Sequence, residues 1–279
     1  MAEVIEKAHA SGERHAVWDK RTAIVDFVRD TFALADVELR KLRRDPVELL
    51  TRAIQPALWL LVFGQVFGRI KAIPTGSLDY LTFMAPGILA QSVLFIAIFY
   101  GISVIWERDL GILQKLLVSP APRTALVLGK ALSAGVRGLA QGIIIYALAL
   151  MLGIRLDFSV WHVAGVVFFI ILGSALFSTF SLAVACLVKT RERFMGIGQV
   201  LTMPLFFASN AIYPIASMPA WVRAVANVNP LSYQVDALRS LMVHGGQSVF
   251  GIGLDAGVLL LVFTGLVLVT ARLYPNVAT

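Results

Sequence analysis

Few residues of this sequence are of the types that perform catalysis, and their spacing does not group them. The four histidines lie far apart, and the single cysteine, Cys186, sits within an apolar run. The phosphate-binding pattern G-x-x-x-x-G-K-[ST] is absent, since Gly129-Lys130 is followed by Ala131. We therefore expect no catalytic site, no cofactor, no metal and no ATP hydrolysis in this chain.

Residues 107–123 combine charged residues with leucines at helical spacing. Leu110, Leu113 and Leu117 mark one face of a short predicted helix, the first turn is acidic, and Pro120 ends the helix. A helix that carries exposed leucines beside charges is suited to docking in a groove of a soluble partner. The alternative is a loop helix that is solvated or lies on lipid.

Four further charged residues fall within or near apolar stretches. Lys130 and Arg137 are two helical turns apart on one face, so we expect them to line a cytoplasmic vestibule or, alternatively, to anchor the helix to lipid headgroups. Asp236 and Arg239 lie three residues apart on a predicted helix and are placed to pair. The aromatic residues considered for an apolar pathway, against the alternative of packing or lipid-facing roles, are Phe95, Phe99 and Phe206.

The composition indicates that membrane-spanning helices position these residues. Of 279 residues, 58% are hydrophobic and 15% charged, and the mean hydropathy is +0.80; a soluble domain has about 45–50% and 25%. A soluble enzyme is therefore not expected. A span needs about 17–25 residues, and charge-free stretches predict six spans: residues 53–68, 80–106, 138–154 with an earlier start, 158–188, 194–222 and 256–271.

The distribution of charge predicts the orientation of these spans. If the N-terminus is cytoplasmic, 19 of the 24 Lys and Arg residues lie on the inner side and 5 on the outer side, as expected for cytoplasmic loops. Both termini are then cytoplasmic. The net charge of +7 fits loops that face anionic lipid, so no nucleic-acid partner is expected. Arginine exceeds lysine by 17 to 7, which favours a GC-rich prokaryote and its cytoplasmic membrane.

The N-terminal region is predicted to contain an amphipathic helix. Apolar residues recur at steps of three and four within residues 23–50, among them Val28, Phe32 and Leu39. We expect this helix to lie in the inner membrane interface after a cytoplasmic tail at residues 1–22; packing on a soluble partner is the alternative.

The region before the last span is poor material for a continuous helix. Pro214, Pro219 and Pro230 break the pattern, so residues 208–246 are expected to form a re-entrant pair of short helices on the outer side. This segment either narrows the outer end of a path between the spans or acts as a structural cap over them. Residues 273–279 are a predicted cytoplasmic tail. The span cores contain no carboxylate, which weighs against a proton-coupled mechanism.

Two blocks of the sequence are distinctive in combination. The first block consists of Glu107-Arg108-x-x-Gly111, Leu116-Leu117-Val118-Ser119-Pro120, Arg123 and Gly129-Lys130. The second consists of Tyr213-Pro214, Pro219-x-Trp221, Asn229-Pro230-Leu231-Ser232-Tyr233, Asp236 and Arg239. Together they resemble the signature of type 2 ATP-binding-cassette (ABC) exporter permeases, the family of daunorubicin-resistance and polysaccharide-export permeases. The resemblance covers nearly the whole chain beyond residue 25, and it departs from the family pattern at Ile112 and Gln114, which leaves the partner's identity open.

The resemblance implies an all-α integral membrane permease, with six transmembrane helices in residues 51–272, an N-terminal amphipathic interfacial helix and a re-entrant helical hairpin before the last span. Its first cytoplasmic loop would dock on a separate cassette ATPase, which binds ATP and Mg. The coupling residues implied are Glu107, Arg108, Asp109, Gly111, Leu113, Leu116, Leu117, Pro120 and Arg123. The outer-gate residues implied are Tyr213, Pro214, Trp221, Asn229, Pro230, Tyr233, Asp236 and Arg239.

We therefore expect an exporter permease for an amphiphilic drug, lipid or lipid-linked glycan. Six helices seldom enclose a path wide enough for an amphiphile, so we expect a dimer, either a homodimer or a heterodimer with a paralogous permease. An ion- or proton-coupled secondary carrier is the alternative, although the sequence has no evident inverted repeat. A non-transporting scaffold or an intramembrane enzyme is a third reading.

Overall fold

The computed structural model describes residues 51, 54–71, 73–110, 123–188 and 190–274. Within these ranges the protein is helical, as predicted, and extended backbone pairs only at an isolated bridge between Leu156 and Val243. The predictions for residues 1–50, for residues 111–122 of the predicted coupling loop and for residues 275–279 lie outside the described residues.

The described chain begins with an apolar helix, Ile54–Ile70, that contains the π-helical η1 (Trp59–Gly64) and α4 (Gln65–Ile70). The elements that follow are α5 (Tyr80–Tyr100), α6 (Ile102–Asp109), α8 (Arg123–Met151), α9 (Val160–Leu187), α10 (Arg191–Phe207), the 3₁₀ helix η2 (Ile215–Ser217), α11 (Ala220–Val228), α12 (Pro230–Met242) and α13 (Ile252–Leu273).

Four of these helices are long and apolar enough to cross a membrane. They are Tyr80–Asp109, which joins α5 and α6, then Leu126–Met151 within α8, and α9 and α13. The helix Ile54–Ile70 is a shorter apolar helix, and α10 has 17 residues, at the lower limit of the usual span of about 17–25 residues. The six-span arrangement therefore stays a prediction beyond these four helices.

Helix α9 forms the centre of the bundle. It packs against α5, α8, α12 and α13, and side chains along it, such as Phe169, Leu176 and Phe177, are buried. A helix that is apolar around its whole circumference is expected to be surrounded in this way. Gly173 of α9 leaves the space in which the side chain of Gln234 on α12 lies.

The predicted second span is divided at Gly101, between α5 and α6. A side chain at this position would clash with Ser181 of α9. The Ser181 hydroxyl donates a hydrogen bond to the carbonyl of Ile98, in the last turn of α5. This close approach of α9 anchors the beginning of α6, the helix that leads into the predicted coupling loop.

The charge-free stretch at residues 194–222 is longer than the helix within it, and its last part belongs to the segment predicted separately at residues 208–246. Helix α10 ends at Phe207, and a loop with the short η2 separates it from α11. The reason lies in Asn229, whose side-chain amide donates to the carbonyls of Leu205 (2.7 Å) and Ala208 (2.9 Å). These bonds satisfy carbonyl groups that a helix leaves unpaired where it ends.

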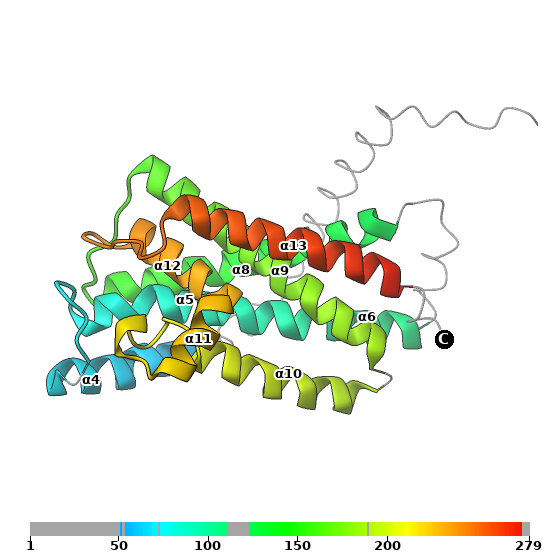
Figure 1. The fold of residues 1–279 in the computed structure, drawn as a ribbon, viewed down its shortest axis with the longest axis horizontal. Coiled ribbons are helices and arrows are strands. Elements are labelled where there is room, and N and C mark those ends of the chain that lie inside the picture. Colours follow the sequence, from blue (N-terminus) through cyan, green and yellow to red (C-terminus); the bar gives the residue numbers. More distant parts are fainter. Residues whose placement is uncertain (1–50, 52–53, 72, 111–122, 189, 275–279) are drawn as a thin grey trace, which may run out of the picture.

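The predicted coupling segment and the predicted outer-gate segment lie at opposite ends of the bundle. Figure 1 shows α4, α11 and α12 toward one end of the long axis, and α6 toward the other end together with the last turns of α13. This grouping matches the two predicted sides of the membrane, whose identity as cytoplasmic and outer stays a prediction.

The loop after α10 packs directly against α5 at Gly87, which leads to a first prediction. A β-carbon at Gly87 would lie 2.3 Å from the carbonyl oxygen of Ala211 and 2.7 Å from its α-carbon. We expect Gly87→Ala to destabilise the protein by about 1–3 kcal/mol, since both clashing atoms belong to backbone. The midpoint of thermal unfolding of the purified protein measures this effect.

The matched control for that substitution is Gly253→Ala on α13. A β-carbon there meets nothing within 4 Å in the described part of the chain, and alanine favours helix over glycine. We expect an unchanged or slightly higher unfolding midpoint. Equal midpoints for the two variants would contradict the close contact of the loop with α5.

Candidate functional site

The predicted coupling segment begins at the end of α6, where an ion pair joins it to α8. Lys130 Nζ lies 2.7 Å from Glu107 Oε1 and 2.6 Å from Glu107 Oε2. The two side chains are only 15% and 27% exposed, so solvent screens their attraction less than that of a surface pair. The sequence predicted that Lys130 lines a vestibule, but it did not predict this ion pair. Glu107 is 23 positions away from Lys130 in the sequence, so helical periodicity does not relate the two residues.

A second ion pair joins α6 to α10. Arg191 Nη2 lies 2.7 Å from Asp109 Oδ2, and the Arg191 guanidinium carbon lies 3.7 Å from the centre of the Trp106 ring. Arg108 also donates to Asp109, at 3.2 Å. A guanidinium over an aromatic face adds cation–π attraction to the ion pair. The end of α6 is thus attached to both α8 and α10.

The other predicted coupling residues are placed as follows. Arg123 is the first residue of α8. The remainder lie outside the described residues: Gly111, Leu113, Leu116, Leu117 and Pro120. Helix α6 precedes residues 111–122 and helix α8 follows them. The Glu107–Lys130 ion pair therefore connects the two helices on either side of the predicted coupling loop.

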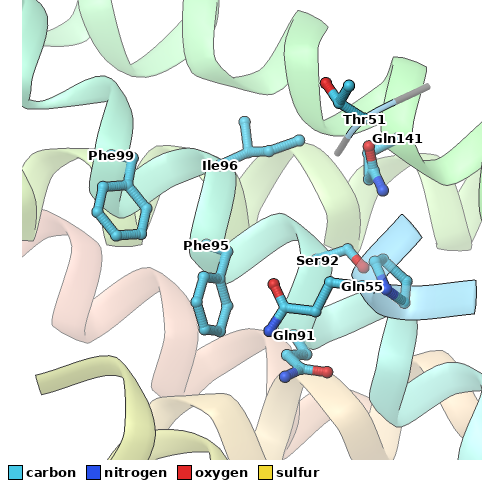
Figure 2. A pocket seen from close by; sticks show the side chains of 9 residues that line it. Thr51, Gln55, Gln91, Ser92, Phe95, Ile96, Phe99 and Gln141 are labelled. Carbon is cyan, nitrogen blue, oxygen red and sulfur yellow. The ribbon is translucent and has the colours of Figure 1, made fainter. Parts of the chain in front are cut away.

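Two of the three predicted pathway aromatics line a cavity of about 210 Å³ between the first helix, α5 and α8. Figure 2 shows the rings of Phe95 and Phe99 on α5, with glutamine side chains from three segments of the chain around the same space. The third aromatic, Phe206, is fully buried, and its ring centre lies 5.6 Å from that of Trp59. The structure thus places Phe206 in helix packing, away from this cavity, and its pathway role stays a prediction.

Arg137, the second predicted vestibule residue, lies on α8 as expected. Its guanidinium carbon lies 5.0 Å from the centre of the Tyr100 ring at the end of α5. Arg137 therefore contacts α5, while Lys130 on the same helix contacts α6.

At the opposite end, Asp236 and Arg239 both lie on α12 and are fully or almost fully buried. They were placed to pair, but within the described residues no ion pair joins them. Arg239 donates instead to the carbonyls of Asn210 (2.6 Å) and Phe83 (3.2 Å), and its guanidinium lies 3.8 Å from the Phe83 ring centre. Phe83 precedes Pro86, in a part of α5 where proline disrupts the regular helix bonds. Arg239 thereby ties α12 to α5 and to the loop after α10.

Asp236 binds the loop that leads into α13. Its Oδ2 accepts hydrogen bonds from the backbone N–H groups of Val249 (2.7 Å) and Phe250 (2.9 Å) and from Ser248 Oγ (2.8 Å). Ser248 Oγ also lies 3.1 Å from Oδ2 of Asp255, which is fully buried in the first turn of α13. The sequence reasoning missed Asp255, because α13 begins at Ile252 and the predicted span began at residue 256.

Of the remaining predicted outer-gate residues, four lie at or bind the ends of helices and two do not bind a helix end through their side chains. Asn229 caps α12 by accepting from Leu231 N at 3.0 Å, and Pro230 occupies the first turn, where proline is favoured. The Tyr233 and Tyr213 hydroxyls donate to the carbonyls of Asn227 and Phe207. Pro214 directly precedes η2, and Trp221 is an exposed side chain on α11.

A polar turn closes the same end of the bundle between α8 and α9. Asp157 accepts a hydrogen bond from Ser159 N at 2.8 Å, and its Oδ2 lies 2.7 Å from His162 Nδ1. The Ser159 hydrogen bond and then the His162 contact hold the pKa of Asp157 below its usual range. The backbone N–H of Asp157 donates to Met242 at the end of α12, so this turn holds α12 in place.

Comparison with known proteins identifies the class to which these features belong. The family model for the ABC-2 type transporter matches residues 29–243, which is well over half of the chain. This protein therefore belongs to the ABC-2 type transporter family.

Individual relatives are similar over most of their length. One is the ycf38 protein of Cyanophora paradoxa, whose name describes a transport permease; it is 30% identical over 86% of this chain and 87% of its own. The daunorubicin resistance ABC transporter permease protein DrrB1 of Streptomyces coeruleorubidus is 30% identical over 83% of this chain and 81% of its own. The probable doxorubicin resistance ABC transporter permease protein DrrC of Mycobacterium tuberculosis is 24% identical over 78% and 79%. The family predicted from the two sequence blocks is thus confirmed.

Proposed function

We propose that this chain is the membrane permease subunit of an ATP-driven exporter, and that it works with a separate cassette ATPase. It forms the translocation path as a dimer and exports an amphiphilic drug, lipid or lipid-linked glycan. Membership of the ABC-2 type transporter family and similarity to drug-resistance permeases support this proposal. So does the sequence, which has no nucleotide-binding pattern of its own.

The observation that carries the proposal is the attachment of α6 to its neighbours by ion pairs. A force applied to residues 107–123 by an ATPase would reach α8 through Glu107–Lys130 and α10 through Asp109–Arg191. The Glu107–Lys130 pair is partly buried, which strengthens it and fixes its geometry. The Asp109–Arg191 pair is more exposed, and the contact of Arg191 with the Trp106 ring adds to it. A loop that only covered the membrane surface would not require its flanking helix to be fixed on two sides.

The orientation and location belong to the same proposal. We place the α6 end and both termini in the cytoplasm, in a prokaryotic cytoplasmic membrane. The 19 to 5 distribution of Lys and Arg supports this side for the α6 end.

The test is assembly with a cognate cassette ATPase. The full-length permease and ATPase should purify as one complex in lipid nanodiscs, and the permease alone should not hydrolyse ATP. We expect Gly111→Pro, in the predicted coupling loop, to lower the amount of purified complex at least about tenfold. The amount of permease in the membrane fraction should not change. Formation of the same complex by this variant and by Glu107→Ala, with unchanged coupling, would contradict the docking role.

One observation favours the alternative of a proton-coupled carrier. Asp255 lies fully buried in the first turn of α13 and shares Ser248 Oγ with Asp236. Two buried carboxylates that face one serine hydroxyl repel each other when both are ionised, which favours a proton on one of them. Transport that responds to a proton gradient and not to ATP would favour this reading.

A further inference from the structure

The cavity between the first helix, α5 and α8 contains hydrogen-bonding groups that the fold does not use. Gln91 on α5 and Gln141 on α8 line this cavity and are 3% and 1% exposed. Among the residues that the structure describes, the Gln91 Nε2 donor and the Gln141 Oε1 acceptor have no hydrogen-bond partner. Most buried polar groups in proteins are paired, and an unpaired one costs stability. A ligand that bonds to both amides would recover that cost.

The rest of the cavity surface determines what kind of ligand fits. Among the described residues, nine line the cavity, and none of these nine is charged. An ionised group placed there would lose its hydration without gaining a counter-charge. On α5, the Phe95 and Phe99 rings lie with centres 6.1 Å apart and supply an apolar wall.

We propose that this cavity binds the uncharged, hydrogen-bonding part of an amphiphile. A carbonyl or hydroxyl oxygen of the ligand accepts from Gln91 Nε2, a hydroxyl or amide N–H donates to Gln141 Oε1, and an adjoining ring or alkyl segment lies against Phe95 and Phe99. The inference rests on the proposed export function and names the chemical class of its substrate. A volume of about 210 Å³ is below the roughly 300–1,000 Å³ of drug-sized pockets, so the cavity takes one part of a larger molecule.

The test uses three fluorescent probes that differ in one terminal group. Naphthylbutanol carries a neutral hydroxyl, butylnaphthalene carries none, and naphthylbutylamine is a cation at neutral pH. Each is titrated onto the purified full-length permease in nanodiscs, with empty nanodiscs subtracted. The Kd of each probe is corrected for its measured partitioning into empty nanodiscs, so that Kd values can be compared between variants, as ratios to the wild type, and between probes.

The variants are Gln91→Met and Gln141→Met, which keep side-chain volume and remove the hydrogen-bonding groups. Each should weaken naphthylbutanol binding about 3–10-fold, the range of one net hydrogen bond, and leave butylnaphthalene binding unchanged. In the wild-type protein naphthylbutylamine should bind at least about tenfold more weakly than naphthylbutanol. The control is Gln199→Met, an exposed glutamine on α10, which should change no probe.

Folding of both cavity variants should be unimpaired, because the two unpaired atoms have no hydrogen bond to lose; their unfolding midpoints check this. The proposal is overturned if both variants bind naphthylbutanol like the wild type, or if the cation binds as tightly as the alcohol. Assembly with the ATPase is measured on the same preparations. If the wild-type permease does not assemble with the ATPase but the probe ratios are as predicted, the exporter is refuted and the binding site is retained. If the wild-type permease assembles but the two variants do not change naphthylbutanol binding, only the binding site is refuted.

Discussion

Replacing Asp236 with leucine is expected to cost about 3–5 kcal/mol of stability, the range for removing one charge from a buried polar network. The substitution leaves the backbone N–H groups of Val249 and Phe250 without their acceptor. It also leaves the guanidinium of Arg239, which is 4% exposed, without a nearby negative charge. The thermal unfolding midpoint in nanodiscs should fall by roughly 10 °C.

Two further variants make this prediction specific. Asp236→Asn keeps one oxygen acceptor and removes the charge, so its midpoint should lie between those of the wild type and Asp236→Leu. Glu192→Leu removes an exposed acid at the start of α10 and should change stability by less than about 1 kcal/mol. If Asp236→Leu unfolds at the temperature of Glu192→Leu, Asp236 does not hold the α12 end of the bundle together.

Reversing the charge of Glu107 should uncouple transport from ATP hydrolysis. In Glu107→Lys a second ammonium group would lie where the carboxylate now contacts Lys130 at 2.6 Å, so the pair would repel and α6 would separate from α8. We expect the rate of ATP-dependent transport to fall at least about tenfold, which corresponds to roughly 1.4 kcal/mol on the barrier of the coupled step. The measurement is ATP-driven probe uptake into inverted proteoliposomes that contain permease and ATPase.

The charge-swapped double variant separates this pairing from loss of the residue itself. Glu107→Lys combined with Lys130→Glu restores opposite charges at the same contact and should recover most of the lost transport. Glu192→Lys reverses an exposed acid elsewhere and should transport normally. Normal transport by Glu107→Lys, or equal defects in the single and double variants, would show that the pair does not transmit the coupling.

The helices were predictable from the sequence where apolar runs were long and uninterrupted. Helices α5, α8, α9 and α13 overlap predicted spans, because burial in lipid or protein requires apolar residues throughout. The end of α10 could be predicted from the prolines but not from the charges. The charge-free stretch runs to residue 222, whereas the proline-rich segment was predicted to begin at residue 208, and the helix ends at Phe207 beside the amide of Asn229.

The site was predictable as a set of residues and less so as a set of contacts. Asp236 and Arg239 were predicted to pair from their spacing on one helix. In the structure each binds backbone from a distant segment, Arg239 at Phe83 and Asp236 at Val249. Such contacts depend on the packing of α12 against α5 and on the loop before α13, for which local periodicity carries no signal.

The cavity shows the same division between residue type and location. Phe95 and Phe99 were predicted as pathway residues, and both line it. Gln91 and Gln141 were not singled out, although a glutamine amide within an apolar run was a signal that could have identified them. Their placement around one space required the packing of α5 against α8.

The most direct test of the central claim is transport by the reconstituted permease and ATPase in inverted proteoliposomes, with naphthylbutanol as the probe. The experiment compares an active ATPase with a variant that binds but does not hydrolyse ATP, each with and without ionophores that collapse ion gradients. We predict uptake with the active ATPase whether or not ionophores are present, and no uptake with the inactive one. Uptake that persists with the inactive ATPase and disappears with the ionophores would contradict the exporter and indicate a gradient-driven carrier.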